Sequence, residues 1–365
     1  MIESPLLATP GAVAVQDAES PDAGTAWHYG DPFAEQRAAV RSVAVVDRSA
    51  RGVIAVPGAD RLTWLHALTS QHFTELPGLA GTEALVLDAH GHVEDHVIAG
   101  HAGGTVWLDG EGFRTAPLLD YLSRMVFWSA VEPRDATAEL AVLTVIGPNA
   151  DELLRGLGIE VPAVDYRLTA LDGGFARRMP WPNRHSVDLV VPRTTLADHW
   201  RRLTDAGARP AGSWAFDALR VEALRPRLGV DTDDRTIPHE VNWLAPAVHL
   251  DKGCYRGQET VAKVANIGRP PRRMVLLHLD GSPEVLPVTG EPVRLGDKVV
   301  GRVGSVARHH ELGPIALALL KRSMPTDAEL LAGADDHVVQ AAVDPDSMAP
   351  DLPAPGRDAI ARLRA

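Results

Sequence analysis

The sequence predicts an α+β protein, and three observations lead to that class. At 365 residues the chain is longer than one hydrophobic core usually supports. Segments 53–68 and 143–157 share a pattern of apolar strand, Gly/Pro turn, Ala-Asp pair and helix with leucines at helical spacing. From residue 273 the chain changes to short strands with Gly and Asp turns, which is typical of a small β-barrel or sandwich. We therefore expect two duplicated α+β subdomains followed by a barrel.

Both chain ends are expected to lie outside these units. Residues 1–25 are rich in Ala, Pro, Ser and acid, and residues 344–365 are Pro-rich with a short amphipathic end, so neither can bury much. We expect a disordered tail at 1–25, the duplicated region at 26–267, the barrel at 268–343 and a second tail at 344–365. Chance similarity is the alternative to duplication, because short strand-to-helix turns recur in many folds.

A β-hairpin is predicted at residues 84–100, with its turn at Asp88–Gly91. Alternation along the second strand puts Asp95 on one face together with Val93 and Val97. A carboxylate with apolar neighbours takes up a proton more easily and can exchange hydrogen bonds with an amine of a ligand. The alternative reading is a satisfied polar residue at the rim of a barrel.

The histidines of this hairpin do not predict a metal site. His90, His92 and His96, with Glu94, have a spacing that can gather imidazoles on one side of a strand. A turn separates them and no fourth ligand is evident, so we expect solvent-facing side chains and no metal. The pair His309-His310 has no companion motif and is expected at the surface.

A helix is predicted after Ser213, which suits an N-cap, and Pro226 ends it. Arg220 and Glu222 lie about 200° apart around such a helix, because each residue turns it by about 100°. They therefore face different sides unless the helix ends near them.

The stretch DKGCYRGQET at 251–260 contains the single cysteine of the chain, Cys254. One cysteine cannot form an internal disulfide or supply the several thiolates of a structural zinc or iron-sulfur site. Two glycines allow a ligand to approach the backbone, and Lys252 and Arg256 favour thiolate over thiol. A reactive sulfur is one interpretation, and a small buried hydrophobe is the other.

The distribution of charge predicts a small anionic ligand rather than nucleic acid. The chain has 36 basic and 48 acidic residues, a net charge of −12, which disfavours binding along a nucleic-acid backbone. Residues 252–273 nevertheless hold six cations and one acid, Glu259. This basic stretch would attract an anion, although a solvated basic face is the alternative. Its cations are Lys252, Arg256, Lys263, Arg269, Arg272 and Arg273.

Several classes of protein are disfavoured by what the sequence lacks. No apolar run approaches the roughly 18 residues that span a bilayer, and the first residues have no cationic leader before an apolar stretch. We therefore expect a cytoplasmic protein without a membrane partner. Glycine-rich phosphate loops and the GxSxG elbow of serine hydrolases are also absent.

At this point a family resemblance can be stated. The segment DKGCYRGQETVAKV resembles the signature of the YgfZ family, in which Lys-Gly-Cys-Tyr-x-Gly-Gln-Glu recurs. These folate-binding proteins are related to the aminomethyltransferase of glycine cleavage. The likeness continues through residues 44–68, 217–244 and 290–320, and it covers roughly residues 27–323.

The resemblance implies a fold and a ligand. The fold would be a three-unit cloverleaf of the aminomethyltransferase type with a central cavity, in which two antiparallel α+β units precede the barrel. Residues 26–267 would then form the folate-binding region, with tetrahydrofolate in the cavity. Members of this family support assembly or repair of iron-sulfur proteins, which would be the partners of this chain.

The resemblance also implies site residues. In the related aminomethyltransferase an Asp on the early hairpin faces the folate amines; the matching pair here is Glu94-Asp95, and alternation favours Asp95. The Arg-x-Glu of the family maps to Arg220 and Glu222, with Glu222 a partner for the pterin ring. Beside Cys254, the motif residues expected at the ligand are Lys252, Tyr255, Arg256, Gln258 and Glu259.

Two positions depart from the family pattern. Leu224 stands where members commonly have Gly, which puts the local turn and the fit of the pterin in question. Glu94 stands where an Asp is usual, so the carboxylate pair is kept but lengthened.

Three functions remain in competition at this stage. The leading hypothesis is a tetrahydrofolate-binding accessory protein of iron-sulfur metabolism in which Cys254 accepts or exchanges a group with a partner. The second is a folate-dependent aminomethyltransferase with Asp95 as acid-base group, against which Cys254 argues because that chemistry needs no thiol. The third is a scaffold that only docks partners. Whether the protein turns over a substrate is left open.

Overall fold

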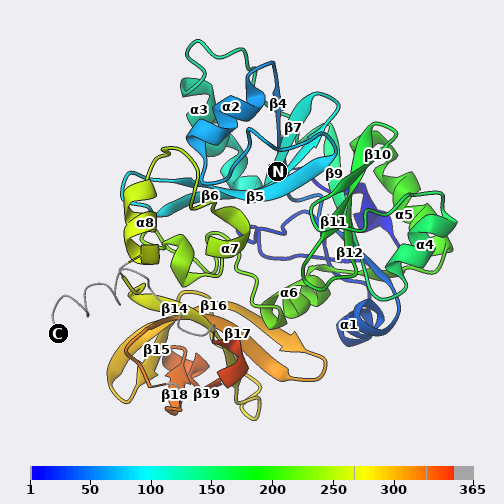
Figure 1. Cartoon of the computed structure of the whole chain (residues 1–365). Helices are drawn as coiled ribbons and strands as arrows, with labels where there is room; N and C mark the ends of the chain where they lie inside the picture. The colour runs from blue at the N-terminus through cyan, green and yellow to red at the C-terminus, as the bar shows by residue number, and fades with distance from the viewer. Residues whose placement is uncertain (1, 267, 326, 349–365) are drawn as a thin grey trace. The chain divides into compact units, whose positions relative to one another are not determined.

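The computed structural model describes residues 2–266, 268–325 and 327–348. By packing, the chain divides into two compact units (Figure 1). The first comprises residues 1–67, 72–84 and 95–219. The second comprises residues 68–71, 85–94 and 220–365, so a short loop and the tip of the early hairpin belong with the C-terminal part of the chain.

The first repeat of the sequence builds a five-stranded sheet. Its strand order is β5-β6-β7-β4-β8, and the helices α2 and α3 follow β4 and β7 along the chain. The strands are β4 (Gly52–Pro57), β5 (Ala80–Leu87), β6 (Val93–Ala102), β7 (Thr105–Gly110) and β8 (Arg134–Asp135), and the helices are α2 (Arg61–Leu68), the 3-10 turn η2 (Gly112–Arg114) and α3 (Thr115–Arg124).

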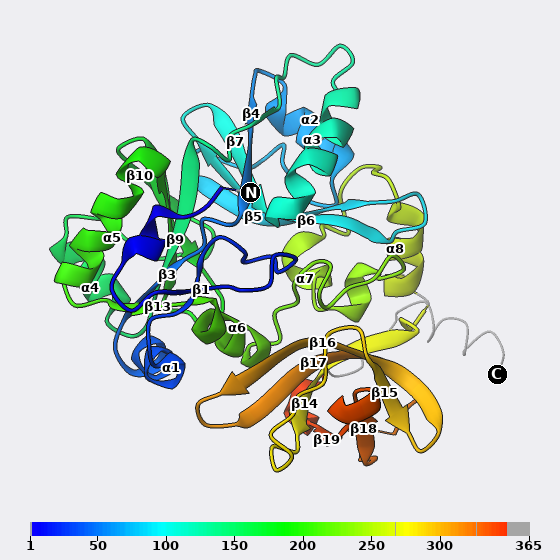
Figure 2. The ribbon, with the colours of Figure 1, turned by 180° about the vertical axis from the view of Figure 1, so that it is seen from behind.

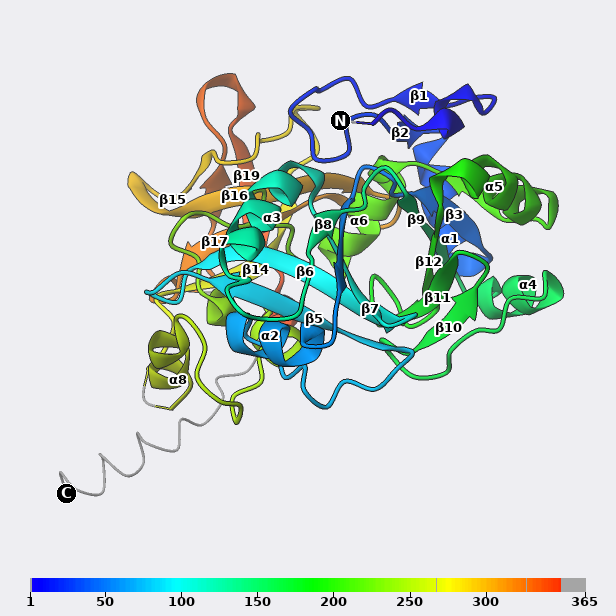
Figure 3. The ribbon, with the colours of Figure 1, turned by 90° about the horizontal axis from the view of Figure 1, so that it is seen from above.

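The second repeat contributes to a six-stranded sheet of order β10-β11-β12-β9-β3-β13, in which only the β3–β13 pair is parallel. Helices α4 and α5 lie on the same face of this sheet (Figures 1 and 3). The strands are β3 (Ala44–Asp47), β9 (Leu140–Ile146), β10 (Leu168–Leu171), β11 (Gly174–Met179), β12 (Ser186–Pro192) and β13 (Arg209–Ala211). The helices are α1 (Pro32–Arg41), α4 (Ala150–Gly156), η3 (Arg193–Thr195), α5 (Leu196–Asp205) and α6 (Ser213–Glu222).

Both repeats are strand–turn–helix units, as predicted: β4 precedes α2, and β9 precedes α4. Their sheets share a core in which Val53 and Ala55 of β4 pack with Val142 of β9. At Gly100 a Cβ would come within 2.9 Å of the Phe175 ring, so glycine is what allows the two sheets this close an approach.

A buried ion network also crosses between the two sheets. The Arg177 guanidinium is fully buried and donates to Asp109 at 2.7 Å and to Asp188 at 2.8 Å. Burial alone would raise the pKa of Asp109, but Arg177 and Arg51 outweigh it and lower this pKa to about 2. Because each charge is paired, removal of one member would leave the others uncompensated.

The C-terminal part forms the predicted barrel. Six strands close in the order β14-β17-β16-β15-β18-β19 around an apolar core that includes Val275, Leu277 and Leu320. These strands are β14 (Arg272–Leu279), β15 (Pro292–Leu295), β16 (Lys298–His309), β17 (Gly313–Lys321), β18 (Leu330–Ala332) and β19 (Val339–Val343). The second unit also holds η4 (Pro238–Glu240), α7 (Leu244–Ala247), α8 (Gln258–Asn266) and η5 (Asp335–His337). The α+β class with a terminal barrel is confirmed.

The N-terminal segment is part of the fold, which differs from the disordered tail expected at 1–25. It forms η1 (Pro5–Ala8) and pairs β1 (Val13–Ala14) with β2 (Ala26–His28). Leu6 is buried in one cluster with Val45 and Trp200, and Figure 2 shows the segment passing beside α5. Composition did not predict this order, because the segment has no hydrophobic core of its own and packs instead against the core of the six-stranded sheet.

The first residues of the predicted C-terminal tail are packed as well, which differs from the expectation that the tail buries little. Residues 345–347 form the 3-10 turn η6, and Met348 packs against the barrel core. The rest of the predicted tail, 349–365, lies outside the described residues. The domain limits expected at 26, 268 and 344 follow sequence texture and stay predictions. Among the described helices, none is long and apolar enough to cross a bilayer.

Candidate functional site

Asp95 lies on β6 with the neighbours that alternation predicted. Val93, Asp95 and Val97 are buried along the strand, whereas Glu94 and His96 are half-exposed. Only 3% of Asp95 is exposed. The strand therefore holds one carboxylate among apolar side chains on its inner face.

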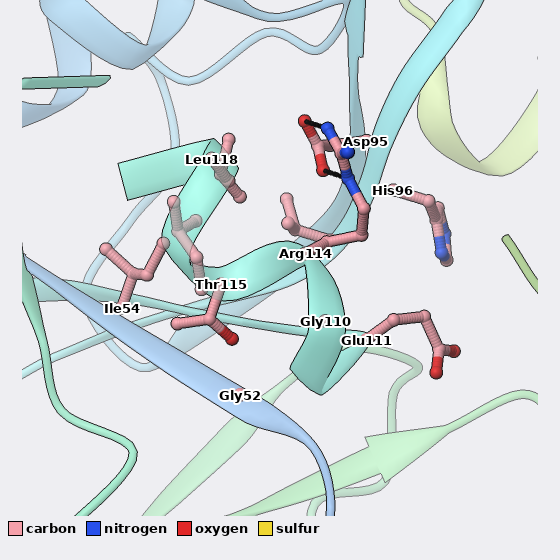
Figure 4. A pocket seen from close by; sticks show the side chains of 11 residues that line it. Gly52, Ile54, Asp95, His96, Gly110, Glu111, Arg114, Thr115 and Leu118 are labelled. Atoms are coloured by element: carbon pink, nitrogen blue, oxygen red, sulfur yellow. Dashed lines mark hydrogen bonds and ion pairs between the residues drawn. The ribbon is translucent and has the colours of Figure 1, made fainter. Parts of the chain in front are cut away.

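The predicted apolar setting of Asp95 was incomplete, because a cation also faces it. Arg114 donates from Nε to Oδ1 at 2.8 Å and from Nη2 to Oδ2 at 3.2 Å, a bidentate pair (Figure 4). Arg114 lies at the end of η2, where the chain enters α3. No local sequence signal points to this pair, because its members are 19 positions apart on different elements.

A small pocket adjoins the pair within the first unit. It has a volume of about 10 Å³, room for about one water molecule, which is far below the roughly 300–1,000 Å³ typical of ligand sites. Its wall is partly apolar and partly polar (Figure 4). The residues that line it are Gly52, Ile54, Asp95, His96, Val97, Leu108, Gly110, Glu111, Arg114, Thr115 and Leu118. A pocket of this size holds a water molecule and not a ring.

The Cys254 loop belongs to the second unit, and its sulfur-bearing residue is exposed. Its neighbours are not. Lys252 is only 7% exposed and donates to the carbonyl oxygens of Thr69 at 2.6 Å and Gln71 at 3.1 Å. Burial lowers the pKa of Lys252 to about 8. The backbone thus presents the cysteine outward while the lysine beside it points inward.

Tyr255 and Gly257 fix the other side of the same loop. Tyr255 is buried, which raises its pKa to about 12, and the Lys252 ammonium lies 4.8 Å from its ring centroid. Gly257 has a φ of +80°, and a Cβ there would come within 2.8 Å of the Gly91 Cα in the hairpin turn. Glycine is therefore required for this contact between the cysteine loop and the hairpin.

The outward cation of the loop, Arg256, pairs with Glu94 of the hairpin at 2.9 Å. Both side chains are 39% exposed, so this pair adds little stability but gives the loop a further link. The lengthened carboxylate, Glu94, is thereby engaged by Arg256, whereas the neighbouring Asp95 faces Arg114.

At least four of the six cations of the basic stretch 252–273 have partners within the chain, and two of these, Arg256 and Arg272, pair with carboxylates. Besides Lys252 and Arg256, Arg273 donates to the Met324 carbonyl, and Arg272 binds two carboxylates. Arg272 lies 2.8 Å from Glu240 and donates to Asp233; although burial acts to raise the pKa of Asp233, hydrogen bonds from Arg272 and Thr236 lower it to about 2. Sequence counting overestimated the charge available to an anionic ligand, because it could not see these pairs.

The remaining motif residues lie near the start of α8. Gln258 donates to the Lys252 carbonyl at 3.3 Å, which closes the loop on itself. Glu259 is exposed in the first turn of the helix.

Arg220 and Glu222 both contact strand β16, because α6 ends at Glu222, which is the exception that the angular argument allowed. Arg220 is buried and donates to Asp231 at 3.1 Å and Ser305 at 2.7 Å, which joins α6 to the barrel inside the second unit. The Glu222 side chain is 47% exposed, with its Oε2 3.3 Å from His309 Nε2. Arg220 therefore stabilises the fold, and Glu222 is the residue of this pair that remains accessible to solvent.

The expectation that His309-His310 lies at the surface is wrong. His309 is buried, and its Nδ1 accepts from the backbone N–H groups of Glu311 at 3.2 Å and Leu312 at 3.1 Å. We assign the proton to Nε2, which then faces Glu222. His309 is the last residue of β16 and His310 follows it, a location that a search for motifs does not reveal.

Leu224 has a backbone conformation that favours glycine. The residue has a φ of +54°, a left-handed conformation that L side chains rarely adopt, just after α6 ends at Glu222. The turn is thus kept without glycine, at a cost in backbone strain.

The described residues contain no cluster of His, Cys, Asp or Glu that could hold a metal ion. Of the predicted site residues, Asp95 belongs to the first unit. The second unit holds Arg220, Glu222, Lys252, Cys254, Tyr255, Arg256, Gln258 and Glu259.

Comparison with known proteins adds a family context. Residues 24–252 match the GCVT N-terminal domain. The chain is 31% identical over 293 residues to an aminomethyltransferase of Rubrobacter xylanophilus. The aligned region covers 78% of this chain and 77% of that protein. It is 27% identical over 317 residues to an aminomethyltransferase of Thermotoga neapolitana, covering 83% and 85%.

A solved structure shows the same fold. The aminomethyltransferase T of the glycine cleavage system from Bartonella henselae superposes with a TM-score of 0.80 at 17% identity, covering 93% of this chain and 94% of that one. At this identity the likeness concerns the fold alone.

Proposed function

This chain belongs to the aminomethyltransferase-type family defined by the GCVT N-terminal domain, and on that premise we propose a function. It is a tetrahydrofolate-binding accessory protein of the cytoplasm that supports assembly or repair of iron-sulfur proteins. Cys254 is the group that accepts or exchanges a sulfur, metal or one-carbon unit with a partner.

The observation that carries this proposal is the placement of Cys254. Its side chain is exposed, while Lys252 and Tyr255 on either side are buried and partnered. A thiol used for packing would be buried, as cysteine usually is in cores. Here the anchoring residues support a loop that offers its sulfur to another molecule.

The residues present suit a folate in part. Asp95 supplies a buried acceptor, and reduced pterins carry N–H groups that donate to carboxylates. Glu222 is a second, exposed acceptor. When bound, tetrahydrofolate supplies a carrier for one-carbon units. Asp95 would orient the ring, and Arg220 would support α6 from inside rather than contact the ligand.

A cellular test separates the sulfur from the fold. In cells that lack their own copy of this protein, the Cys254→Ser variant should fail to restore aconitase activity, while the purified variant keeps the wild-type unfolding midpoint. Asp251→Asn is a matched control, because Asp251 is exposed in the same loop and outside the proposed site. Full restoration by Cys254→Ser would refute the role assigned to the sulfur.

Aminomethyl transfer is the second candidate, and the names of the similar proteins favour it. In that case Asp95 would work in proton transfer and Cys254 would be dispensable. Formation of methylene-tetrahydrofolate from an aminomethyl donor would then occur with wild-type protein and with Cys254→Ser, but not with Asp95→Asn. Absence of turnover at saturating tetrahydrofolate would remove this candidate.

A further inference from the structure

Strand β16 contacts the last turn of helix α6 at two places. Ser305 and His309 are both buried residues of this strand. Ser305 accepts from Arg220 at 2.7 Å. Two positions further along the chain, Oε2 of Glu222 lies 3.3 Å from Nε2 of His309. The first contact fixes the end of the helix, and the second reaches its exposed carboxylate.

The ring of His309 is held in one orientation. Its Nδ1 accepts from the backbone N–H groups of Glu311 at 3.2 Å and Leu312 at 3.1 Å. The side chain is only 2% exposed, and its ring centroid lies 4.5 Å from that of His310. Because Nδ1 serves as an acceptor, the neutral ring carries its proton on Nε2, the atom that faces Glu222.

This Nε2–H group is a buried donor that needs an acceptor. Among the described residues Nε2 of His309 has no hydrogen bond, although the Glu222 carboxylate lies within ion-pair distance. Buried polar groups in folded proteins are nearly always hydrogen-bonded. The Glu222 side chain is 47% exposed and can rotate, so a small rotation turns this contact into a hydrogen bond.

The Glu222 carboxylate keeps its second oxygen for a ligand. Within the described part of the chain this carboxylate makes no hydrogen bond, and only Oε2 faces a buried donor. Because Glu222 is half-exposed, a ligand reaches Oε1 without displacing a protein group. A glutamate held by one oxygen has lost rotamer freedom before the ligand arrives, so less entropy is lost on binding.

We propose that His309 is a positioning residue that holds Oε2 of Glu222 and presents Oε1 to an N–H donor of the ligand. The inference rests on the proposed folate function and adds a residue to that site. His309 acts through the carboxylate and does not touch the ligand. Fixing one long side chain in advance is worth about tenfold in affinity.

Two variants of His309 test the proposal by calorimetry on the full chain, with tetrahydrofolate and the tail-less 6-methyltetrahydropterin as probes. His309→Asn keeps a polar atom near the position of Nδ1 and loses the donor at Nε2, so it should bind both probes about tenfold more weakly than wild type. His309→Gln places an amide near the position of Nε2 and should bind both probes with an affinity close to that of the wild type.

Thermal unfolding should rank the two variants in the opposite order. His309→Gln leaves the N–H groups of Glu311 and Leu312 without their acceptor, so it should be the less stable variant. A residue with a purely structural role would instead lose affinity in step with stability.

A matched control and a second background check that the effect passes through Glu222. His278 lies on β14 of the same barrel, and its Nε2 is 3.1 Å from Asp344, so His278→Asn removes a similar histidine–carboxylate contact and should leave affinity unchanged. In a Glu222→Ala background, His309→Asn should no longer weaken binding, because no carboxylate is left to orient.

Three results would count against the proposal. If affinity follows stability, with His309→Gln binding more weakly than His309→Asn, the role of His309 is structural only. An equal loss of affinity in the Glu222→Ala background overturns the proposal too, because the effect would then bypass the carboxylate. If the wild type binds neither probe, the proposed folate function itself is wrong and this inference fails with it.

Discussion

The two candidate regions solve opposite problems. At Asp95 the functional atoms are buried and the partner, Arg114, borders solvent. At the cysteine loop the functional residue, Cys254, is exposed, and its neighbours Lys252 and Tyr255 are buried. Asp95 is thus shielded from solvent, whereas Cys254 is exposed on a loop whose neighbouring residues are buried.

The difference teaches where mutations should be felt. Near Asp95 stability and the proposed ligand binding depend on the same atoms, so we expect a substitution to change both. In the cysteine loop these two roles belong to different residues. Lys252 and Tyr255 stabilise the loop, and the exposed Cys254 side chain adds little to stability. Substitutions in the cysteine loop can therefore separate an effect on stability from an effect on reactivity. Substitutions at Asp95 cannot.

The largest expected effect is an asymmetry within the first region. Arg114→Ala leaves the buried Asp95 carboxylate without this partner and should lower the free energy of unfolding by about 3 kcal/mol. Asp95→Ala should cost about 1–2 kcal/mol, because the half-exposed arginine can turn into water. Urea unfolding of both variants at pH 7 measures this. Equal costs would contradict the assigned roles.

Next in size is a pH effect in the second region. The pKa of Lys252 is about 8 in the folded chain and 10.5 when exposed, so between these values the unfolded state binds more protons. Stability contributed at this site therefore rises as the pH goes from 8 to 10.5, by roughly 2 kcal/mol. Between pH 8 and 10.5, the urea midpoint of the wild type should therefore increase relative to that of Lys252→Met.

The matched control for that experiment is Arg256→Met in the same loop. Arg256 is exposed and stays charged throughout, so its difference from wild type should not change with pH and should remain below about 1 kcal/mol. A flat profile for Lys252→Met as well would show that the ammonium is not desolvated.

A smaller effect is expected at Leu224, where α6 ends. Leu224→Gly should be more stable than Leu224→Ala by about 1 kcal/mol, because both remove the leucine side chain beyond Cβ and only glycine, which has no Cβ, adopts a φ of +54° without strain. Thermal unfolding of the two variants gives the comparison. If alanine matched glycine, the left-handed conformation would not be present in solution.

Local pattern predicted those features that depend on local geometry. Alternation along 93–97 placed Asp95 on the buried face, and strand–turn–helix spacing located both repeats. Each of these conclusions requires only the periodicity of a single strand or helix. Helix periodicity did not separate Arg220 from Glu222, because α6 ends at Glu222 and both side chains reach β16.

Features that depend on distant residues were not predictable. Arg114 reaches Asp95 from another element, and Lys252 finds its acceptors in residues 69–71, far away in sequence. The same applies to the burial of His309 and of Leu6, which depends on surfaces supplied by other segments. The predicted effect of Lys252 and Arg256 on the cysteine also ignored that both cations have partners elsewhere.

The central claim is that anchored neighbours present the Cys254 sulfur to solvent, and its alkylation rate tests this most directly. Iodoacetamide should modify the native protein within about tenfold of the rate for the urea-unfolded chain at the same pH, since exposure sets access to the thiolate. Lys252→Met, which loosens the loop, should move the native rate towards the unfolded one. Protection of the native thiol by a thousandfold or more would contradict the account.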